Sequence, residues 1–244
     1  MVGKGEGTVT KLDNQIAVLK YMLLFMNVIT WMIATAIFAL CMWLRFEPGF
    51  QDWIEVLEVQ IVYIGPYILM VISAVVMIVS FLGCLSSLQE NSLLIYVFIG
   101  TQILAFLGFV AGSAVMLNFT TRSSDMQPLI RESMRRLIMN HHYQKGQETL
   151  AMIQEHIGCC GADGADDYIA LRKPLPAQCR DTVTGNAFFH GCVDELTWFF
   201  EEKCAWIAAL AMANAMIHVV NAVMSFILTM AIRKEENEAE TYRR

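Results

Sequence analysis

Four long stretches of this chain of 244 residues contain no Asp, Glu, Lys or Arg. These charge-free stretches are 21–44, 59–89, 91–121 and 204–232. A helix needs about 20 apolar residues to cross the hydrocarbon core of a bilayer, and a charge at its centre costs about 2.5–3.5 kcal/mol on insertion scales. The stretches also lack the polar face of a soluble core helix. The sequence therefore predicts four membrane-spanning helices.

The chain also lacks the motifs that mark common enzyme classes and nucleic-acid-binding proteins. It has no phosphate-binding loop, dinucleotide fingerprint or nucleophile elbow, so no group of residues predicts catalysis. The net charge is −6 and no block of basic residues is present, which argues against a nucleic-acid partner. Residues 1–14 mix both signs of charge and are not a cleaved secretory signal, so the first stretch must direct insertion. We expect a protein that is not an enzyme and whose surroundings are the lipid bilayer.

Lysine and arginine counts in the short segments predict the orientation, because positively charged flanks stay in the cytoplasm. Basic residues lie before the first span at Lys4, Lys11 and Lys20 and after the last at Arg233, Lys234, Arg243 and Arg244, whereas the loop after the first span has only Arg45. We expect a multi-pass plasma-membrane protein with both termini cytoplasmic. The expected parts are a cytoplasmic N-terminus (1–20), spans (21–44, 61–85, 93–117, 204–232), a small extracellular loop (45–60), a cytoplasmic turn (86–92), a large extracellular loop (118–203) and a cytoplasmic tail (233–244).

Four of the seven cysteines lie inside the predicted large loop, at Cys159, Cys160, Cys179 and Cys192. This loop would enter an oxidising lumen during synthesis, so disulfides are expected and no thiolate remains for a metal site. Four cysteines allow three pairings, and ring strain excludes a bond between the adjacent Cys159 and Cys160. In either remaining pairing, one of these neighbours bonds Cys179 and the other bonds Cys192.

The rest of the large loop reads as two helices followed by irregular chain. Apolar residues at helical spacing predict a helix over 126–139 and a second helical stretch through Leu150, Ile153 and Ile157, which can pack as an antiparallel pair. Pro174, Pro176 and the 184–186 turn residues indicate irregular structure, a natural place for partner recognition. The predicted fold class is an all-α membrane protein with four transmembrane helices and a disulfide-stapled, mainly helical extracellular loop.

Polar residues are few within the spans, at Asn27, Gln102, Asn214, His218 and Asn221. The last three are spaced on one face of the fourth span, and we expect that face to point into the bundle because polar groups facing lipid are costly. They would set helix register through hydrogen bonds or line an intramembrane cavity. One histidine cannot form a proton relay, which argues against a transporter.

Two positions are candidates for modification. Cys84 ends the second span on the predicted cytoplasmic side, where a thiol can receive a palmitoyl chain, although a small buried hydrophobe is the alternative. Asn118 begins an Asn-Phe-Thr glycosylation sequon directly beside the third span. We expect Cys41 and Cys204 to be unmodified packing residues.

Motifs along nearly the whole chain resemble the tetraspanin family. They are Lys20-Tyr21 with Asn27 and Trp31, Phe81-Leu82-Gly83-Cys84 with Glu90-Asn91, Cys159-Cys160-Gly161, Pro176-Ala177-Gln178-Cys179, and Gly191-Cys192. The resemblance implies bonds between Cys159 and Cys192 and between Cys160 and Cys179. It also implies a scaffold that gathers other integral membrane proteins laterally and through the large loop, with homo-oligomers a further expectation. We expect no cofactor. Some members are thought to hold a sterol near the position of Asn27, so the resemblance offers a sterol as a ligand that the polar cavity could hold.

The chain departs from the family pattern at a few positions. Asp167-Tyr168 stands where many members have an acidic or polar residue and Trp, which predicts less secure local packing. The frequent acidic residue of the third span is missing, with Gly108 near its apparent position and Gln102 further in. Residues 45–50 and 181–200 are similar to arthropod tetraspanins of epithelial smooth septate junctions, which implies cell–cell junctions and, beside them, endosomal membranes. A claudin-like sealing or pore protein would need paired cysteines in the first loop, and 45–58 contains none.

Overall fold

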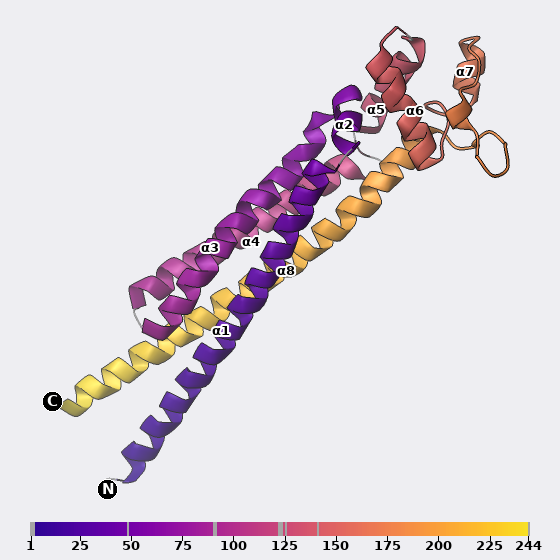
Figure 1. The fold of residues 1–244 in the computed structure, drawn as a ribbon. Helices are drawn as coiled ribbons and strands as arrows, with labels where there is room; N and C mark the ends of the chain where they lie inside the picture. The colour runs from indigo at the N-terminus through magenta and orange to yellow at the C-terminus, as the bar shows by residue number, and fades with distance from the viewer. Residues whose placement is uncertain are drawn as a thin grey trace. The chain divides into compact units, whose positions relative to one another are not determined.

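The computed structural model describes residues 3–47, 49–89, 92–121, 124, 126–140 and 142–243. These residues form helices and no strand, which confirms the all-α fold class. The elements are α1 (Gly3–Phe46), α2 (Phe50–Val56), the 3-10 helix η1 (Gln60–Tyr63), α3 (Ile64–Gln89), α4 (Ser92–Thr120), α5 (Met126–Met139), α6 (Gln144–Ile157), α7 (Asp166–Ala170), the 3-10 helix η2 (Ala177–Cys179) and α8 (Cys192–Arg243) (Figure 1). The predicted turn at 86–92 includes residues 90 and 91, which lie outside the described residues.

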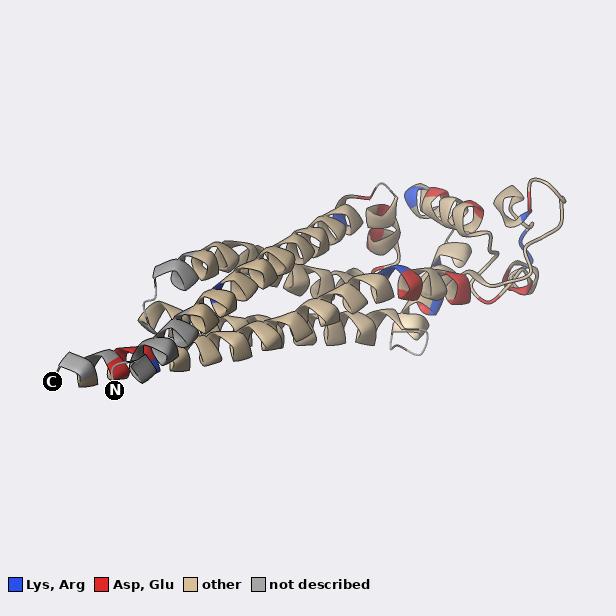
Figure 2. Ribbon diagram, turned by 90° about the horizontal axis from the view of Figure 1, so that it is seen from below, with Lys and Arg blue, Asp and Glu red and all other residues tan. Residues whose placement is uncertain are grey.

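Four of these helices are long and apolar enough to cross a membrane. The candidate spans are Asn14–Phe46, Gln60–Cys84, Leu93–Thr120 and Cys192–Glu238. Figure 2 shows long parts of these helices free of Lys, Arg, Asp and Glu. Helix α8 extends past its charge-free stretch at both ends. Beyond the C-terminal end of that stretch, Lys234 pairs with Glu238, one turn later, at 3.9 Å. The four predicted spans are confirmed as helices.

The chain divides into two compact units. The bundle unit comprises 1–39, 68–111 and 209–244, and the loop unit comprises 40–67 and 112–208. The bundle unit holds the larger parts of the spans, whereas the loop unit holds α2, η1, α5, α6, α7 and η2 together with the adjoining ends of the spans. Each unit has its own interior and is described by itself.

In the bundle unit, large apolar side chains are exposed and polar side chains are buried, the reverse of the usual distribution in a water-soluble protein. Large apolar side chains such as Phe25, Ile78 and Leu104 are about two-thirds exposed, at 65, 67 and 68%. The buried side chains include Asn214, Asn221 and several serines and threonines of the same helices. Soluble proteins rarely expose contiguous apolar surface on this scale, whereas lipid tails solvate it. The side-chain distribution of this unit therefore fits a hydrocarbon environment.

Small residues allow the helices of the bundle unit to approach closely. A Cβ atom added at Gly83 would lie 2.4 Å from the Phe98 ring, and one added at Gly108 would lie 2.6 Å from the Ile72 side chain. Such contacts are the main source of helix association in membranes, where the hydrophobic effect between helices is absent. Gly108 therefore contributes close packing between helices.

The loop unit is built on amphipathic helices. Helix α5 has the predicted bounds, and its apolar face buries Ile130, Met134 and Ile138. Helix α6 buries Leu150 and Ile153 and ends at Gly158, whose left-handed φ of 77° caps it. The short helix α2 was not predicted, because 45–60 was interpreted only as a loop. Its buried Phe50, Trp53 and Ile54 at i, i+3 and i+4 are the signal that sequence reasoning missed.

Candidate functional site

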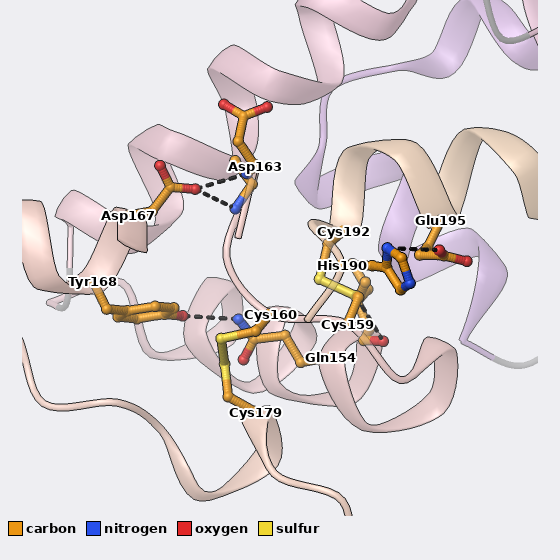
Figure 3. Close-up of a disulfide and its surroundings, with 12 residues drawn as sticks. Gln154, Cys159, Cys160, Asp163, Asp167, Tyr168, Cys179, His190, Cys192 and Glu195 are labelled. Carbon is orange, nitrogen blue, oxygen red and sulfur yellow. Dashed lines mark hydrogen bonds and ion pairs between the residues drawn. A yellow bond between two sulfur atoms is a disulfide. The ribbon is translucent and has the colours of Figure 1, made fainter. Parts of the chain in front are cut away.

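Two disulfides hold the base of the large loop (118–203) together. Cys159 bonds Cys192 and Cys160 bonds Cys179, which is the pairing that the tetraspanin resemblance implied (Figure 3). All four cysteines are fully buried, at 0% exposure. The first bond joins the chain just after α6 to the first residue of α8, and the second joins it to η2. The adjacent cysteines therefore fasten two separate segments to one point.

The turn after the cysteine pair requires glycine. Gly161 has a left-handed φ of 65°, and a Cβ atom there would lie 2.1 Å from the carbonyl oxygen of Gly164. Backbone hydrogen bonds then cross to the start of α8, from Cys192 N to Gly161 O at 3.1 Å and from Val193 N to Ala162 O at 3.0 Å. The Cys-Cys-Gly motif thus combines a crosslink with a backbone clamp that only glycine permits.

Asp167 and Tyr168 stabilise this turn, contrary to the expectation of less secure packing. The Asp167 carboxylate accepts hydrogen bonds from the backbone N–H groups of Ala162 and Asp163 at 2.8 and 2.7 Å (Figure 3). Tyr168 is only 5% exposed, and its hydroxyl accepts a hydrogen bond from Gln154 Nε2 at 2.9 Å. Burial raises the pKa of the Tyr168 hydroxyl. Tyr168 is therefore packed in the interior with a polar partner.

Replacement of Asp167 by alanine is expected to destabilise the loop unit by about 1–2 kcal/mol, because two backbone donors lose a charged acceptor. Asp167→Asn retains an oxygen acceptor and should lose less. The measurement is thermal unfolding of the full-length protein in detergent, followed by near-ultraviolet circular dichroism. An alanine variant as stable as the wild type would show that solvent replaces both hydrogen bonds at no cost.

Asp163 connects the turn to α5. Its carboxylate oxygens pair with Arg131 and Arg135, each at 2.7 Å. All three side chains are at least one-third exposed, so each pair contributes no more than about 1 kcal/mol. The contacts orient the turn on the helix more than they stabilise it.

The segment 180–190, which we call the projecting segment, exposes apolar side chains on the surface of the loop unit. Val183 and Phe189 are 90 and 91% exposed. A turn orders the segment, since the Asp181 carboxylate accepts hydrogen bonds from Val183 N at 2.9 Å and Thr184 Oγ1 at 2.8 Å, which lowers its pKa. Phe188 N donates to Cys179 O at 2.8 Å, so the Cys160–Cys179 bond anchors one side of the segment.

Polar side chains meet inside the bundle unit. His218 Nδ1 is hydrogen bonded to Gln102 Oε1, and the His218 ring stacks on Phe109 with centroids 5.5 Å apart. Asn221 Nδ2 donates to Thr30 Oγ1 at 3.2 Å. These contacts join the first, third and fourth spans. The predicted inward orientation of Asn214, His218 and Asn221 is confirmed, because all three are buried. Thr30 and Phe109 are partners that the sequence did not identify.

Several buried polar atoms of the bundle unit lack a hydrogen-bond partner among the described residues. They are both amide atoms of Asn27 and of Asn214, His218 Nε2 and Asn221 Oδ1. A cavity of about 90 Å³ lies beside Gln102, His218 and Ser80. Buried polar atoms without a partner cost about 1–3 kcal/mol each, so these atoms would gain from a polar guest such as water or a hydroxyl.

The candidate modification sites lie on helices. Cys84 is half-buried near the end of α3, and Asn118 is exposed in the last turn of α4. Cys41 and Cys204 are free and buried, in agreement with a packing role. Among the residues that the structure describes, no group of three or more His, Cys, Asp or Glu side chains is placed to hold a metal ion.

Comparisons with known proteins agree with this architecture. The model of the tetraspanin family matches residues 19–231. The chain is 56% identical to "Tetraspanin-2A" of Drosophila melanogaster over 96% of both chains. It is 27% identical to "CD9 antigen" of Homo sapiens and 25% identical to "CD81 antigen" of Bos taurus, each over 88% of this chain and 94% of the relative. Four apolar spans, the paired cysteines of the large loop and the matched family model together show that this chain is a member of the tetraspanin family.

Proposed function

We propose that the chain is a membrane scaffold that gathers specific partner proteins into microdomains and recognises their ectodomains through the projecting segment. Family membership supports interaction with other membrane proteins. The observation that carries the proposal is the pair of almost fully exposed apolar side chains, Val183 and Phe189, on a turn anchored by a disulfide. Exposed apolar residues held in place by a rigid scaffold lower the entropy cost of binding and are common at protein interfaces.

The orientation that this function needs follows from the basic residues that flank the spans. With both termini in the cytoplasm, the large loop faces outward and the apolar surface of the bundle unit is left for lateral partners or a second copy of the chain. Protease added outside intact cells should then cut the large loop and spare both termini.

Partner recognition is tested by Val183→Ser with Phe189→Ser. We expect this double variant to lose its ectodomain partners in mild-detergent co-purification, because about two apolar anchors are enough to dominate a small interface. Ile169→Ser is the matched control, since Ile169 is 69% exposed on α7 of the same unit. Proximity labelling in the native epithelium provides the second measurement.

Two results would argue against this assignment. An unchanged partner list in the double variant would move the contacts into the spans. Equal losses in the double variant and in Ile169→Ser would indicate a general effect of surface polarity. Intact mass and cell-surface amounts should match the wild type in each case, so that partner loss is not a folding defect.

A sterol bound in the polar cluster is a second part of the proposal. Among the described residues, the amide atoms of Asn27 and Asn214 have no hydrogen-bond partner, and a sterol hydroxyl could bond to them. The cavity of about 90 Å³ is lined by Gln102 and His218 and not by Asn27 or Asn214, and it is smaller than the roughly 300–1,000 Å³ of ligand pockets, so the helices must separate to admit the ring system. Photocrosslinking with a diazirine sterol, compared between wild type and Asn27→Leu, tests this step.

We further propose a place of action at epithelial smooth septate junctions, on the similarity of 45–50 and 181–200 to arthropod junction tetraspanins. Barrier assembly between epithelial cells would then be the outcome of partner clustering, with endosomal membranes as a further location. Immunolocalisation in gut-type epithelium tests it, and a uniform distribution over the cell surface would contradict it.

A further inference from the structure

A pocket of about 540 Å³ opens on the loop unit. Its walls come from the end of α1, the chain before α2, α2 itself, α6 and the start of α8. The residues with aromatic or charged side chains on these walls include Trp43, Glu47, Trp53, Glu155, Phe199 and Lys203. The volume falls within the range of about 300–1,000 Å³ that is usual for ligand sites. No function argued above uses this pocket.

The pocket lies at the level where two spans meet polar chain. The charge-free stretch of the first span ends at residue 44, next to Trp43, and that of the fourth begins at residue 204, next to Lys203. Tryptophan and lysine at the ends of spans lie among lipid headgroups. The pocket therefore opens where a headgroup is the most concentrated solute.

Aromatic rings and two glutamates line the same space. The Trp53 ring lies 6.4 Å from Phe199 and 5.5 Å from His156 between centroids, and Trp43 is 54% exposed at the rim. Glu47 and Glu155 form no ion pair within the described part of the chain. Rings and carboxylates around one cavity are the surroundings that bind an alkylammonium group, by cation–π and Coulomb attraction.

The pocket also offers groups for an anion. Lys203 Nζ lies 5.6 Å from the Phe199 ring centroid on the pocket wall. Trp53 is 94% buried, and its indole N–H has no acceptor among the described residues. Gly49, which also lines the pocket, has no side chain to fill the space beside this N–H: a Cβ added to Gly49 would lie 3.8 Å from the indole nitrogen. A buried donor without an acceptor is uncommon and marks a place where a ligand oxygen would be stabilised.

We propose that this pocket binds the headgroup of a zwitterionic phospholipid. Glu47, Glu155 and the aromatic rings hold the ammonium, and Lys203 with the Trp53 N–H holds the phosphate. A purely cationic ligand would be repelled by Lys203 and a purely anionic one by the two glutamates, so both charges must be on one ligand. The leaflet depends on the orientation proposed above, but the chemistry of the pocket does not.

The test uses the full-length protein purified in detergent and exchanged into an equimolar mixture of dioleoyl phosphatidylcholine, phosphatidylethanolamine and phosphatidylglycerol. Native mass spectrometry then counts the lipids retained. We expect about five times as many molecules of each zwitterionic lipid as of phosphatidylglycerol to be retained. Phosphatidylglycerol lacks the ammonium group, and one desolvated cation–π or carboxylate contact to that group is enough to give a preference of this size. Glu47→Gln with Glu155→Gln should remove the preference, and Lys203→Gln should reduce retention of all three lipids.

Glu148→Gln is the matched control, because Glu148 lies on α6 with Glu155 but bonds Gln144 at 3.2 Å outside the pocket. Trp43→Ala gives a second test that leaves both carboxylates in place, and it should also weaken the preference. Intact mass and circular dichroism should show both disulfides and the helices retained in every variant.

Several outcomes would overturn the proposal. Equal retention of the three lipids, or an unchanged preference in the double glutamine variant, would exclude a headgroup site. Soluble phosphocholine that binds as tightly as the lipid would identify a small solute as the occupant. If the double glutamine variant co-purified with different proteins while its lipid ratio stayed unchanged, the occupant of the pocket would be a basic side chain of a partner protein. The lipid measurement needs no partner protein, so its failure and the failure of the scaffold proposal are distinguishable.

Discussion

Replacement of both Cys159 and Cys192 by serine is expected to reduce the stability of the loop unit by about 3–4 kcal/mol in the chain-entropy model. The two residues are separated by 33 positions, and their bond fixes the start of α8 to the end of α6. Changing both cysteines leaves no free thiol from that bond. The measurement is limited trypsin digestion of the full-length protein, in which the variant should be cut in the loop at protease concentrations that leave the wild type intact.

Two further variants serve as controls for this result. Cys160→Ser with Cys179→Ser removes the bond across 19 positions and should cost slightly less, about 3 kcal/mol, with early cleavage in the projecting segment. Cys84→Ser lies outside the loop unit and should leave the digestion pattern unchanged. Wild-type resistance in the Cys159 and Cys192 variant would show that helix packing alone holds the loop.

Replacement of Gly161 by alanine is expected to destabilise the loop unit by about 3 kcal/mol or more. A left-handed conformation costs a residue with a Cβ about 1–2 kcal/mol, and overpacking adds roughly 1–3 kcal/mol. The second contribution arises because the new Cβ would lie 2.1 Å from the Gly164 carbonyl oxygen, a backbone atom that cannot rotate away. Thermal unfolding of the full-length protein, followed by tryptophan fluorescence, measures the loss.

Gly185→Ala separates the two contributions. Gly185 also has a left-handed φ, of 71°, but nothing lies within 4 Å of its added Cβ. It should therefore show only the conformational cost of about 1–2 kcal/mol. If both alanine variants unfold at the same temperature, the close contact at Gly161 relaxes without cost and the turn is more adaptable than its hydrogen bonds indicate.

Sequence reasoning located the spans and α5 because their signals are local. Charge-free length marks a span, and apolar spacing over 126–139 marks an amphipathic helix without reference to any other part of the chain. The disulfide partners were narrowed to two choices by geometry, and only resemblance selected one. Helix α2 was missed because seven residues, 50–56, give too short a window for its period to stand out.

Properties that depend on distant residues could not be predicted. The stacking of His218 on Phe109 and the hydrogen bond between Asn221 and Thr30 each join different helices, and spacing along one helix does not reveal the partner. The support that Gln154 gives Tyr168 is likewise a tertiary contact. The pocket around Trp53 needs several parts of the chain at once, from α1, α2, α6, α8 and the chain before α2, none of which carries a recognisable motif.

The order of the cysteines along the chain has a consequence for biogenesis. With the large loop on the luminal side, as proposed above, Cys179 enters the lumen before Cys192, so both Cys159 and Cys160 can be oxidised with Cys179 before their last partner arrives. A bond between Cys159 and Cys179 would then have to be reshuffled by thiol–disulfide exchange, which is fastest when an isomerase supplies the attacking thiolate. A fraction of newly made protein is therefore expected to pass through this mispaired intermediate and to depend on the redox enzymes of the secretory pathway for its yield.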